Sequence, residues 1–373
     1  MPQTRERRRS SRLDAARSPG DEGAVWVLRY LIDRGVLNAA EVVRAVLLAE
    51  DISVSHRSYR VSVDGRPRWF VKRSDPIRSG GRDLAVEATF YRLTESHRSL
   101  AGVVPECRLI GDGDEILVLA AVPGVPLSTA IQRPPAGMSF EPAAALRAYG
   151  HAVAQVHRVR PRTFGQPPWL LSALEPRWGR YAWLPPPCAA LLMRLAGSRS
   201  CRAGFSVAQL EWRLSCLVHG DIRWANAFVA FEGDGARTWL VDWELACVGD
   251  PAWDVGSLLA DIVATTALGY AGATPADTWN WCSLVLAGYR DRANPEAGPW
   301  RELLRRSVRL AAVRLVQALV EHGHGSGDDL PSAEAALMPW VTDWLARAPA
   351  IGAALAEDAA HPKRLREREG LPA

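Results

Sequence analysis

The sequence predicts an α+β protein of two lobes, with a small β-rich N-terminal lobe and a larger helical C-terminal lobe. Short β-rich runs and one amphipathic helix alternate up to residue 122, and helical periodicity dominates beyond the turn Pro123–Pro126. The 373 residues are enough for two hydrophobic cores. The expected organisation is a disordered basic tail at 1–22, an N-terminal lobe at 23–122, a C-terminal lobe at 123–360 and a charged tail at 361–373.

The N-terminal lobe is predicted as two helices, a small sheet and one packed helix. Helices are expected over Val25–Ile32 and Ala39–Leu48, and an amphipathic helix over Asp83–Glu95. Strands are expected at Ile52–Val54, Tyr59–Val63, Trp69–Lys72, Cys107–Ile110 and Ile116–Leu119. Asp64-Gly65 is typical of a tight hairpin turn between the second and third of these strands.

The C-terminal lobe is predicted from long segments of helical periodicity separated by proline-rich loops. Helices are expected over Pro142–Arg158, Val207–Cys216, Val255–Ala267, Thr274–Tyr289, Trp300–His322 and Ala333–Ala348. Loops are expected near 134–135, 161–168 and 185–187. A hairpin is expected within the lobe, because Ala227–Phe231 and Thr238–Val241 are β-rich and a Glu-Gly-Asp-Gly turn separates them.

Composition and charge exclude several classes of function. The net charge is +4, but residues 1–18 contain six arginines and two acidic residues, so the remaining chain is neutral and no basic nucleic-acid surface is expected. No apolar stretch is long enough to span a membrane, and the N-terminus lacks the pattern of a secretory signal. The six cysteines are scattered without metal-ligand spacing, which is typical of reduced thiols. A cytoplasmic protein is expected.

Lysine is rare in this chain, and one of the two lysines ends a predicted strand. Lys72 follows the apolar run Trp69–Val71, and Lys363 lies in the C-terminal tail, whereas every other basic residue among the 45 is arginine. A lysine on a strand of a small sheet is one of the parts of a kinase-type phosphoryl-transfer site. Lys72 is therefore a candidate for contact with phosphate, although an exposed strand end would also explain it.

A second group of polar residues surrounds the predicted hairpin of the C-terminal lobe. Asp221 and Asn226 share one turn after an apolar run, and Asp242 follows the second hairpin strand. Taken alone, Asp221 and Asn226 are also typical of a turn-capping motif. The hairpin brings Asn226 and Asp242 to the same end, however, and carboxylate and amide oxygens are the ligands that Mg²⁺ prefers. The combination favours an ATP-dependent phosphotransferase.

These residues resemble the signature of the aminoglycoside phosphotransferase and choline kinase-like families, which are relatives of the protein kinases. The resemblance rests on His219-Gly220-Asp221-x4-Asn226, Val241-Asp242-Trp243-Glu244 and Gly249-Asp250-Pro251-x2-Asp254. It implies a two-lobed, protein-kinase-like fold that uses ATP and Mg²⁺. It also implies that Asp221 is the catalytic base, that Asn226 and Asp242 hold Mg²⁺, and that Asp254 braces the catalytic loop.

The resemblance also implies roles for residues of the N-terminal lobe. Lys72 would contact the α- and β-phosphates, and Glu87 would pair with it. The run Leu117–Gly124 would be the hinge that holds adenine through its backbone, with Ala120 and Val122 as the contacts. Ser55 would approach phosphate from the turn Ser53–Ser58, where kinases often have glycines and this chain has none.

The acceptor is left open by the sequence, because acceptor residues are not fixed by the fold. One hypothesis is a hydroxyl-bearing small molecule such as an aminoglycoside, for which Glu321, Asp328 and Asp329 are candidate acidic contacts. A second is Ser or Thr of a precursor peptide in natural-product biosynthesis, with a separate lyase as partner. A third is a pseudokinase that binds a partner without catalysis. Arg223, in the predicted catalytic loop, either holds phosphate or an acidic acceptor or is a surface arginine.

Overall fold

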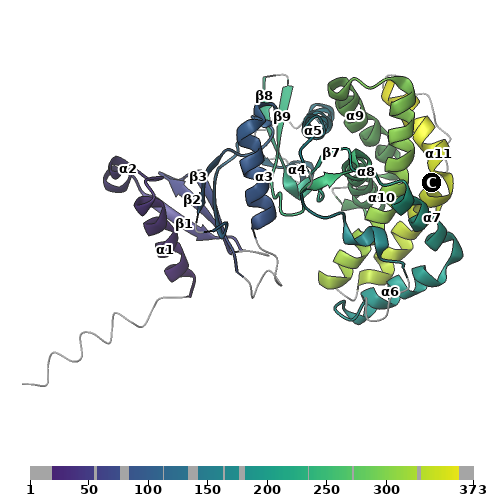
Figure 1. Cartoon of the computed structure of the whole chain (residues 1–373), viewed down its shortest axis with the longest axis horizontal. Coiled ribbons are helices and arrows are strands. Elements are labelled where there is room, and N and C mark those ends of the chain that lie inside the picture. The colour runs from purple at the N-terminus through teal and green to yellow at the C-terminus, as the bar shows by residue number, and fades with distance from the viewer. Residues whose placement is uncertain are drawn as a thin grey trace, which may run out of the picture. The chain divides into compact units, whose positions relative to one another are not determined.

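The structure is a computed structural model that describes residues 19–53, 57–75, 84–111, 113–132, 142–162, 164–175, 181–233, 235–270, 273–325 and 329–360. The chain divides into two compact units (Figure 1). The first comprises Met1–Tyr91 with Pro105–Ala121, and the second comprises Arg92–Val104 with Val122–Ala373. Arg92–Val104 therefore belongs to the second unit, whereas the sequence places it in the N-terminal lobe. The α+β class, with a small sheet-containing unit and a larger helical one, is confirmed.

The first unit is built on a five-stranded antiparallel sheet with strand order β1-β2-β3-β5-β4. Helix α1 packs on this sheet, where Val27 and Leu31 are buried against Val61, Val71 and Val118. The hairpin turn at Asp64 and Gly65 is confirmed, because both residues have the positive φ that such a turn requires. The helices and strands of the first unit are α1 (Pro19–Asp33), α2 (Ala39–Arg44), β1 (Leu47–Asp51), β2 (Arg57–Val63), β3 (Arg66–Arg73), β4 (Cys107–Gly111) and β5 (Ile116–Ala120). Helix α3 (Ala85–Ser96) begins in this unit, and its last residues, from Arg92, belong to the second unit.

The start of the first unit differs from the prediction. Helix α1 already begins at Pro19, inside the expected tail. Helix α2 begins with a capping box between Asn38 and Glu41 but ends at Arg44, because Ala45 is extended. The first strand is consequently β1, paired with β2, and not Ile52–Val54. The sequence prediction was wrong because Ala39–Leu48 satisfies helical periodicity, and pairing with the neighbouring strand overrides that local preference.

The second unit is mostly helical and contains two small antiparallel sheets, with strand orders β6-β8-β9 and β10-β7. Helix α8 is buried on nearly all sides, which explains its nearly continuous apolar sequence. Its helices are α4 (Leu127–Gln132), α5 (Pro142–Val156), α6 (Pro186–Gly197), α7 (Arg199–Leu210), α8 (Pro251–Ala267), α9 (Pro275–Ala293), α10 (Ala297–Gly325) and α11 (Leu330–Ala360). Its strands are β6 (Val125–Pro126), β7 (Cys216–Val218), β8 (Ala227–Glu232), β9 (Gly235–Leu240) and β10 (Cys247–Gly249), with 3₁₀ turns at η2 (Arg98–Leu100), η3 (Trp169–Ser172) and η4 (Trp224–Asn226).

Two predictions for the second unit were wrong. The helix expected over Val207–Cys216 is instead the end of α7, a connection, and the first residue of strand β7. The loop expected at 185–187 is the start of α6, with Pro186 in the first turn. Proline is well tolerated there, because the first N–H groups of a helix have no intrahelical partner. The predicted hairpin is confirmed as β8 and β9.

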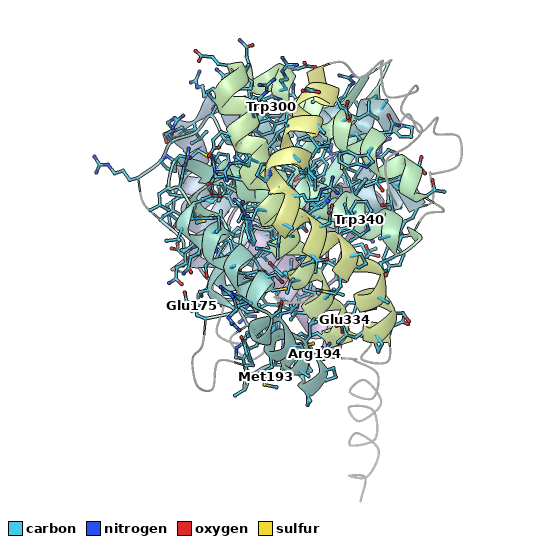
Figure 2. The ribbon with its side chains drawn as sticks, turned by 90° about the vertical axis from the view of Figure 1, so that its right-hand side faces the viewer. Glu175, Met193, Arg194, Trp300, Glu334 and Trp340 are labelled. Carbon is cyan, nitrogen blue, oxygen red and sulfur yellow. The ribbon has the colours of Figure 1, made fainter. Side chains whose placement is uncertain are left out.

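One face of the second unit is formed by long helices that pack side by side (Figure 2). Helix α11 crosses this face, and an ion pair of 2.5 Å between Arg194 and Glu334 connects it to α6. Within the described residues, no helix combines the length and the apolar character that crossing a membrane requires.

Candidate active site

The loop between β7 and η4 carries the predicted catalytic residues on a tightly constrained backbone. Gly220 has φ +83°, and a Cβ placed on it would lie 2.2 Å from the carbonyl oxygen of Leu245. Only glycine therefore fits between His219 and Asp221 without displacing the neighbouring loop. The ring of His219 is accordingly buried, and its Nε2 lies 2.9 Å from the carbonyl oxygen of Val241. The chain direction at Asp221 is thus fixed by backbone packing.

Asp254, in the first turns of α8, binds the backbone of this loop. Its Oδ2 accepts a hydrogen bond of 2.7 Å from the N–H of His219, and its Oδ1 accepts one of 3.0 Å from the N–H of Gly220. The same carboxylate lies 3.1 Å from Nε2 of His157. The carboxylate is fully buried, so these bonds hold the loop in a single conformation.

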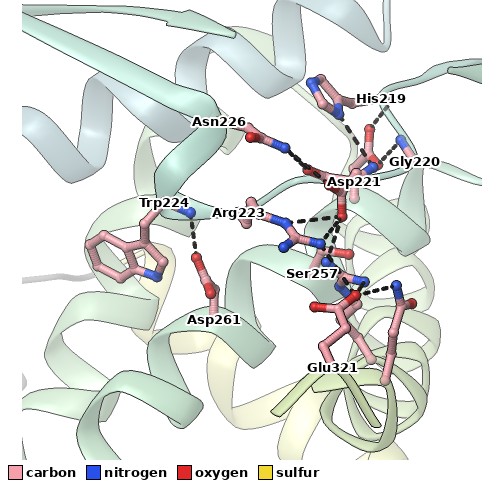
Figure 3. A network of polar contacts seen from close by, with 12 residues as sticks. His219, Gly220, Asp221, Arg223, Trp224, Asn226, Ser257, Asp261 and Glu321 are labelled. Carbon is pink, nitrogen blue, oxygen red and sulfur yellow. Dashed lines mark hydrogen bonds and ion pairs between the residues drawn. The ribbon is translucent and has the colours of Figure 1, made fainter. Parts of the chain in front are cut away.

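Asp221 is the centre of a buried network of charges (Figure 3). Its Oδ1 accepts hydrogen bonds from Nη2 of Arg314, at 2.7 Å, and from Nη2 of Arg223, at 2.6 Å. Its Oδ2 accepts one of 3.1 Å from Nδ2 of Asn226. Burial by itself raises the pKa of Asp221, but the two guanidinium groups outweigh that effect and leave the pKa below its ordinary value. Asp221 is therefore ionised at neutral pH.

Asn226 and Asp242 are neighbours across the hairpin, as the sequence indicates. The N–H of Val241 donates a 2.9 Å hydrogen bond to the carbonyl oxygen of Asn226, so Asp242 directly follows that contact. Asp242 has φ +69°, an unusual value for a residue other than glycine, and such values are common at functional sites. Because Nδ2 of Asn226 faces Asp221, its Oδ1 is the amide atom left to bind a cation.

The amide oxygen of Asn226 and the carboxylate of Asp242 fit the preference of Mg²⁺, which uses one or two protein carboxylates and phosphate oxygens. In the part of the chain that the structure describes, three or more His, Cys, Asp or Glu side chains nowhere gather as a metal site. One carboxylate with one amide is compatible with a Mg²⁺ that nucleotide phosphates help to hold.

A second carboxylate of α8, Asp261, was not predicted as part of the site. Its Oδ2 accepts a 2.5 Å hydrogen bond from the N–H of Trp224, at the far end of the catalytic loop (Figure 3). Burial raises the pKa of Asp261 to about 7, although the bond from Trp224 and the charges of Arg314 and Arg223 oppose that shift. Because Asp261 lies seven residues after Asp254, both acids are on one face of α8.

Arg314 was also missed by the sequence analysis. It lies in α10, its side chain is only 8% exposed, and besides Asp221 it contacts Glu321 at 3.5 Å. Arg314 and Asp261 share a signal that could have identified them. Each is a single charged residue within an otherwise apolar helical run, and a charge on a buried face requires a partner.

The first unit contains the predicted pair of Lys72 and Glu87. Lys72 is on β3 and Glu87 on α3, and Nζ lies 2.9 Å and 2.8 Å from the two carboxylate oxygens of Glu87. Glu87 is fully buried, and the side chain of Lys72 is 16% exposed. The pair thus orients the ammonium group of Lys72 and keeps part of it accessible.

The remaining predicted contacts are placed as follows. Ala120 ends β5, and its N–H donates a 2.8 Å hydrogen bond to the carbonyl oxygen of Glu106. That N–H is therefore engaged within the first unit and cannot also donate a hydrogen bond to adenine. Val122 begins the connection to β6 and is half-buried. Ser55 lies outside the described residues.

Two side chains of the glycine-free turn Ser53–Ser58, those of Ser53 and Arg57, form hydrogen bonds in the described part of the chain. Oγ of Ser53 accepts a 2.9 Å hydrogen bond from the N–H of Ser58, and Nε of Arg57 donates one of 2.8 Å to Asp75. The pKa of Arg57 is raised, chiefly by this hydrogen bond with Asp75. Arg57 is thus already paired with a carboxylate.

Comparison with known proteins gives one family and several structures. The model of a family described as "Phosphotransferase enzyme family" matches residues 49–284, which is more than half of the chain. A microcompartment-associated aminopropanol kinase is similar over 85% of this chain and 94% of its own, with 18% identity and a TM-score of 0.47. A glucosamine kinase is similar over 90% of this chain and 85% of its own, with 16% identity and a TM-score of 0.46. None of the curated proteins compared with the chain matches it.

Proposed function

Because this chain belongs to the phosphotransferase enzyme family, we propose that it transfers the γ-phosphoryl group of ATP to a hydroxyl group of a small molecule. The observation that supports this reaction best is the position of Asp221. It is ionised, its loop is held by Asp254, and it shares a hydrogen bond with Asn226, next to the end of strand β9 that Asp242 follows. Such an arrangement of a carboxylate and a cation site suits phosphoryl transfer.

In this proposal, Asp221 orients the acceptor hydroxyl and receives its proton. The hydroxyl oxygen forms a bond to the γ-phosphorus, the bond from that phosphorus to the bridging oxygen breaks, and ADP leaves. Oδ1 of Asp221 already binds two arginines, so Oδ2 is the oxygen with room for a further donor. Because its pKa is lowered, Asp221 is a weak base, and its main contribution is to position the hydroxyl.

The same proposal assigns roles to the other predicted residues. Lys72, oriented by Glu87, would bind phosphate oxygens of ATP. Asn226 and Asp242 would hold Mg²⁺, which supplies positive charge to the phosphates when it is bound. A non-catalytic pseudokinase is the weaker hypothesis, because the Lys72–Glu87 pair and the polar residues around the β8–β9 hairpin supply each polar group that the reaction needs.

The contacts of Glu321 bear on the acceptor. Its Oε1 lies 3.3 Å from Nη2 of Arg223 and 3.5 Å from Nη1 of Arg314, so its charge is already compensated. Asp328 lies outside the described residues, and Asp329 is exposed before α11. A polycation would require uncompensated carboxylates beside Asp221. These contacts favour a hydroxyl-bearing natural product of low positive charge over an aminoglycoside as acceptor.

Measurement of ATP turnover with and without Mg²⁺ tests the proposed reaction. The purified protein is incubated with labelled ATP and a panel of hydroxylated natural products, and labelled product is quantified. Asp221→Asn should reduce the rate of transfer by on the order of 10²–10⁴. Asp343→Asn is the matched control, because Asp343 is an exposed helix residue paired with Arg347, and it should leave the rate unchanged. Full activity of Asp221→Asn would contradict the assignment of the base, and nucleotide binding without any turnover would indicate a pseudokinase.

A further inference from the structure

A recess lies in the helical unit, apart from the catalytic loop. It is an open groove of about 750 Å³ between η2, the N-terminal half of β9, and helices α5 and α9. Its described lining is rich in small apolar residues and arginines, among them Ala101, Val103, Arg147, Ala236, Arg237 and Arg292. No residue of the predicted catalytic or metal-binding set contributes to this lining. The groove is therefore separate from the catalytic residues named above.

One wall of the groove is the outer edge of strand β9. The N–H of Val241 points inward, to Asn226, whereas the N–H of Leu240 points outward and donates a 2.8 Å hydrogen bond to the carbonyl oxygen of Val103. In an antiparallel strand these directions alternate, so the N–H and C=O groups of Thr238 and Ala236 also point outward. Within the described part of the chain, β8 is the only strand that pairs with β9. The part of the outer edge that precedes Leu240 can therefore accept another strand, whereas the N–H of Leu240 is already bonded to Val103.

Thr238 gives an independent indication that this edge binds something. Its side chain lines the groove and is 2% exposed, and its Oγ1 has no hydrogen-bond partner among the described residues. Buried hydroxyl groups are almost always paired, because an unpaired one loses its bonds to water without compensation. A ligand that lies along β9 would supply the missing partner.

The groove carries an excess of positive charge. Arg147, Arg237 and Arg292 face a single aspartate in the described lining, Asp291, which lies 3.5 Å from Arg147. Arg237 is held in place, because its Nε donates a 3.0 Å hydrogen bond to the carbonyl oxygen of Gly102.

The pKa of Arg292 is lowered, first by burial and then by the nearby charge of Arg158. The pKa of His151 is lowered as well, by burial and by Arg292. In both cases burial is the larger cause, and a neighbouring arginine adds to it.

From the strand edge, Thr238 and the arginines together, we propose that this groove binds an extended acidic segment of a partner protein, which adds to β9 as a further strand. Backbone hydrogen bonds to Ala236 and Thr238 would provide affinity, and acidic side chains would reach Arg147 and Arg292. The termini of this chain are unsuitable occupants, because residues 1–18 carry six arginines against two acids and residues 361–373 are also net basic. The occupant is therefore a segment of another protein.

Fluorescence anisotropy with short labelled peptides tests this proposal without any need for catalysis. The probe is an eight-residue peptide of alternating Glu and Val, which favours an extended strand with acids on one face. Peptides with Gln or Lys in place of Glu test the charge. Two further versions carry N-methyl groups on all Glu amides or on all Val amides, so that in either register one version cannot donate hydrogen bonds to β9.

The acidic peptide should bind at least about tenfold more tightly than the Gln peptide, and more weakly at high salt. One of the two N-methylated versions should lose binding. The double variant Arg147→Gln/Arg292→Gln should bind the acidic peptide about tenfold more weakly, and Ala236→Pro, which removes one outward N–H, should also weaken binding. Arg66→Gln/Arg199→Gln, with the same change of charge outside the groove, is the matched control and should bind normally.

Three results would overturn the proposal. The first is equal binding of the Glu and Gln peptides by the unaltered protein. The second is unchanged affinity in Arg147→Gln/Arg292→Gln, which would place the peptide elsewhere. The third is normal binding of both N-methylated peptides, which would show attraction of charge without addition of a strand. Thermal unfolding of Ala236→Pro distinguishes loss of the site from loss of the fold, and the arginine variant decides the question if Ala236→Pro is unfolded.

Discussion

Replacement of Asp261 by asparagine should stabilise this protein, and the gain should grow with pH. The folded state raises the pKa of Asp261 from 3.8 to about 7, chiefly through burial. Between these two values the folded protein holds a proton that the unfolded chain has released, so stability falls as pH rises through this window. A shift of roughly three pH units corresponds to a destabilisation of about 4 kcal/mol above pH 7. Asparagine has no such penalty, and its amide oxygen can still accept the N–H of Trp224.

The assay is urea unfolding of the wild type and of Asp261→Asn between pH 4 and pH 8, followed by tryptophan fluorescence. The difference in the free energy of unfolding should be near zero at pH 4, should rise up to about pH 7, and should then level off at up to about 4 kcal/mol. Asp343→Asn, at an exposed position of α11, should show no comparable dependence. A difference that does not vary with pH, or a variant that is less stable at pH 8, would refute the reasoning that burial dominates at Asp261.

Three further variants test the site by different measurements. Asp254→Asn should lower the free energy of unfolding by roughly 2–4 kcal/mol, because the N–H of His219 or of Gly220 would then face the NH₂ group of the asparagine instead of an acceptor. Equal urea midpoints of the variant and the wild type would contradict this reasoning. Lys72→Met should lower the free energy of unfolding, measured by thermal unfolding, by roughly 3–5 kcal/mol, because buried Glu87 loses the ammonium group of Lys72. The double variant Lys72→Met/Glu87→Gln should recover part of this loss. Gly220→Ala should abolish ATP turnover, whereas Gly197→Ala, with open space around it, should not.

The hairpin and the loop before it could be predicted from sequence because their signals are local. The turn after His219 requires glycine, the two hairpin strands alternate, and Asp242 follows the end of the second strand. The pair of Lys72 and Glu87 was expected from the family resemblance, and the structure contains it. Strand β1 was mispredicted for the opposite reason. Its β conformation depends on pairing with β2, which no local pattern reveals.

Asp261 and Arg314 show what local patterns leave out. Both lie in helices whose apolar periodicity was recognised, but which buried neighbour each charge contacts depends on how α8 and α10 pack against the catalytic loop. The groove along β9 is a similar case, since its arginines come from three separate elements.

By itself, the sequence determined the α+β class, the hairpin of the second unit and the residue types that phosphoryl transfer needs, because periodicity, turns and short motifs lie in neighbouring residues. Only the tertiary structure decided which charges surround Asp221 and how its pKa is set. Ionisation depends on burial and on distances between groups that lie up to 93 residues apart in the chain, and these quantities exist only after folding.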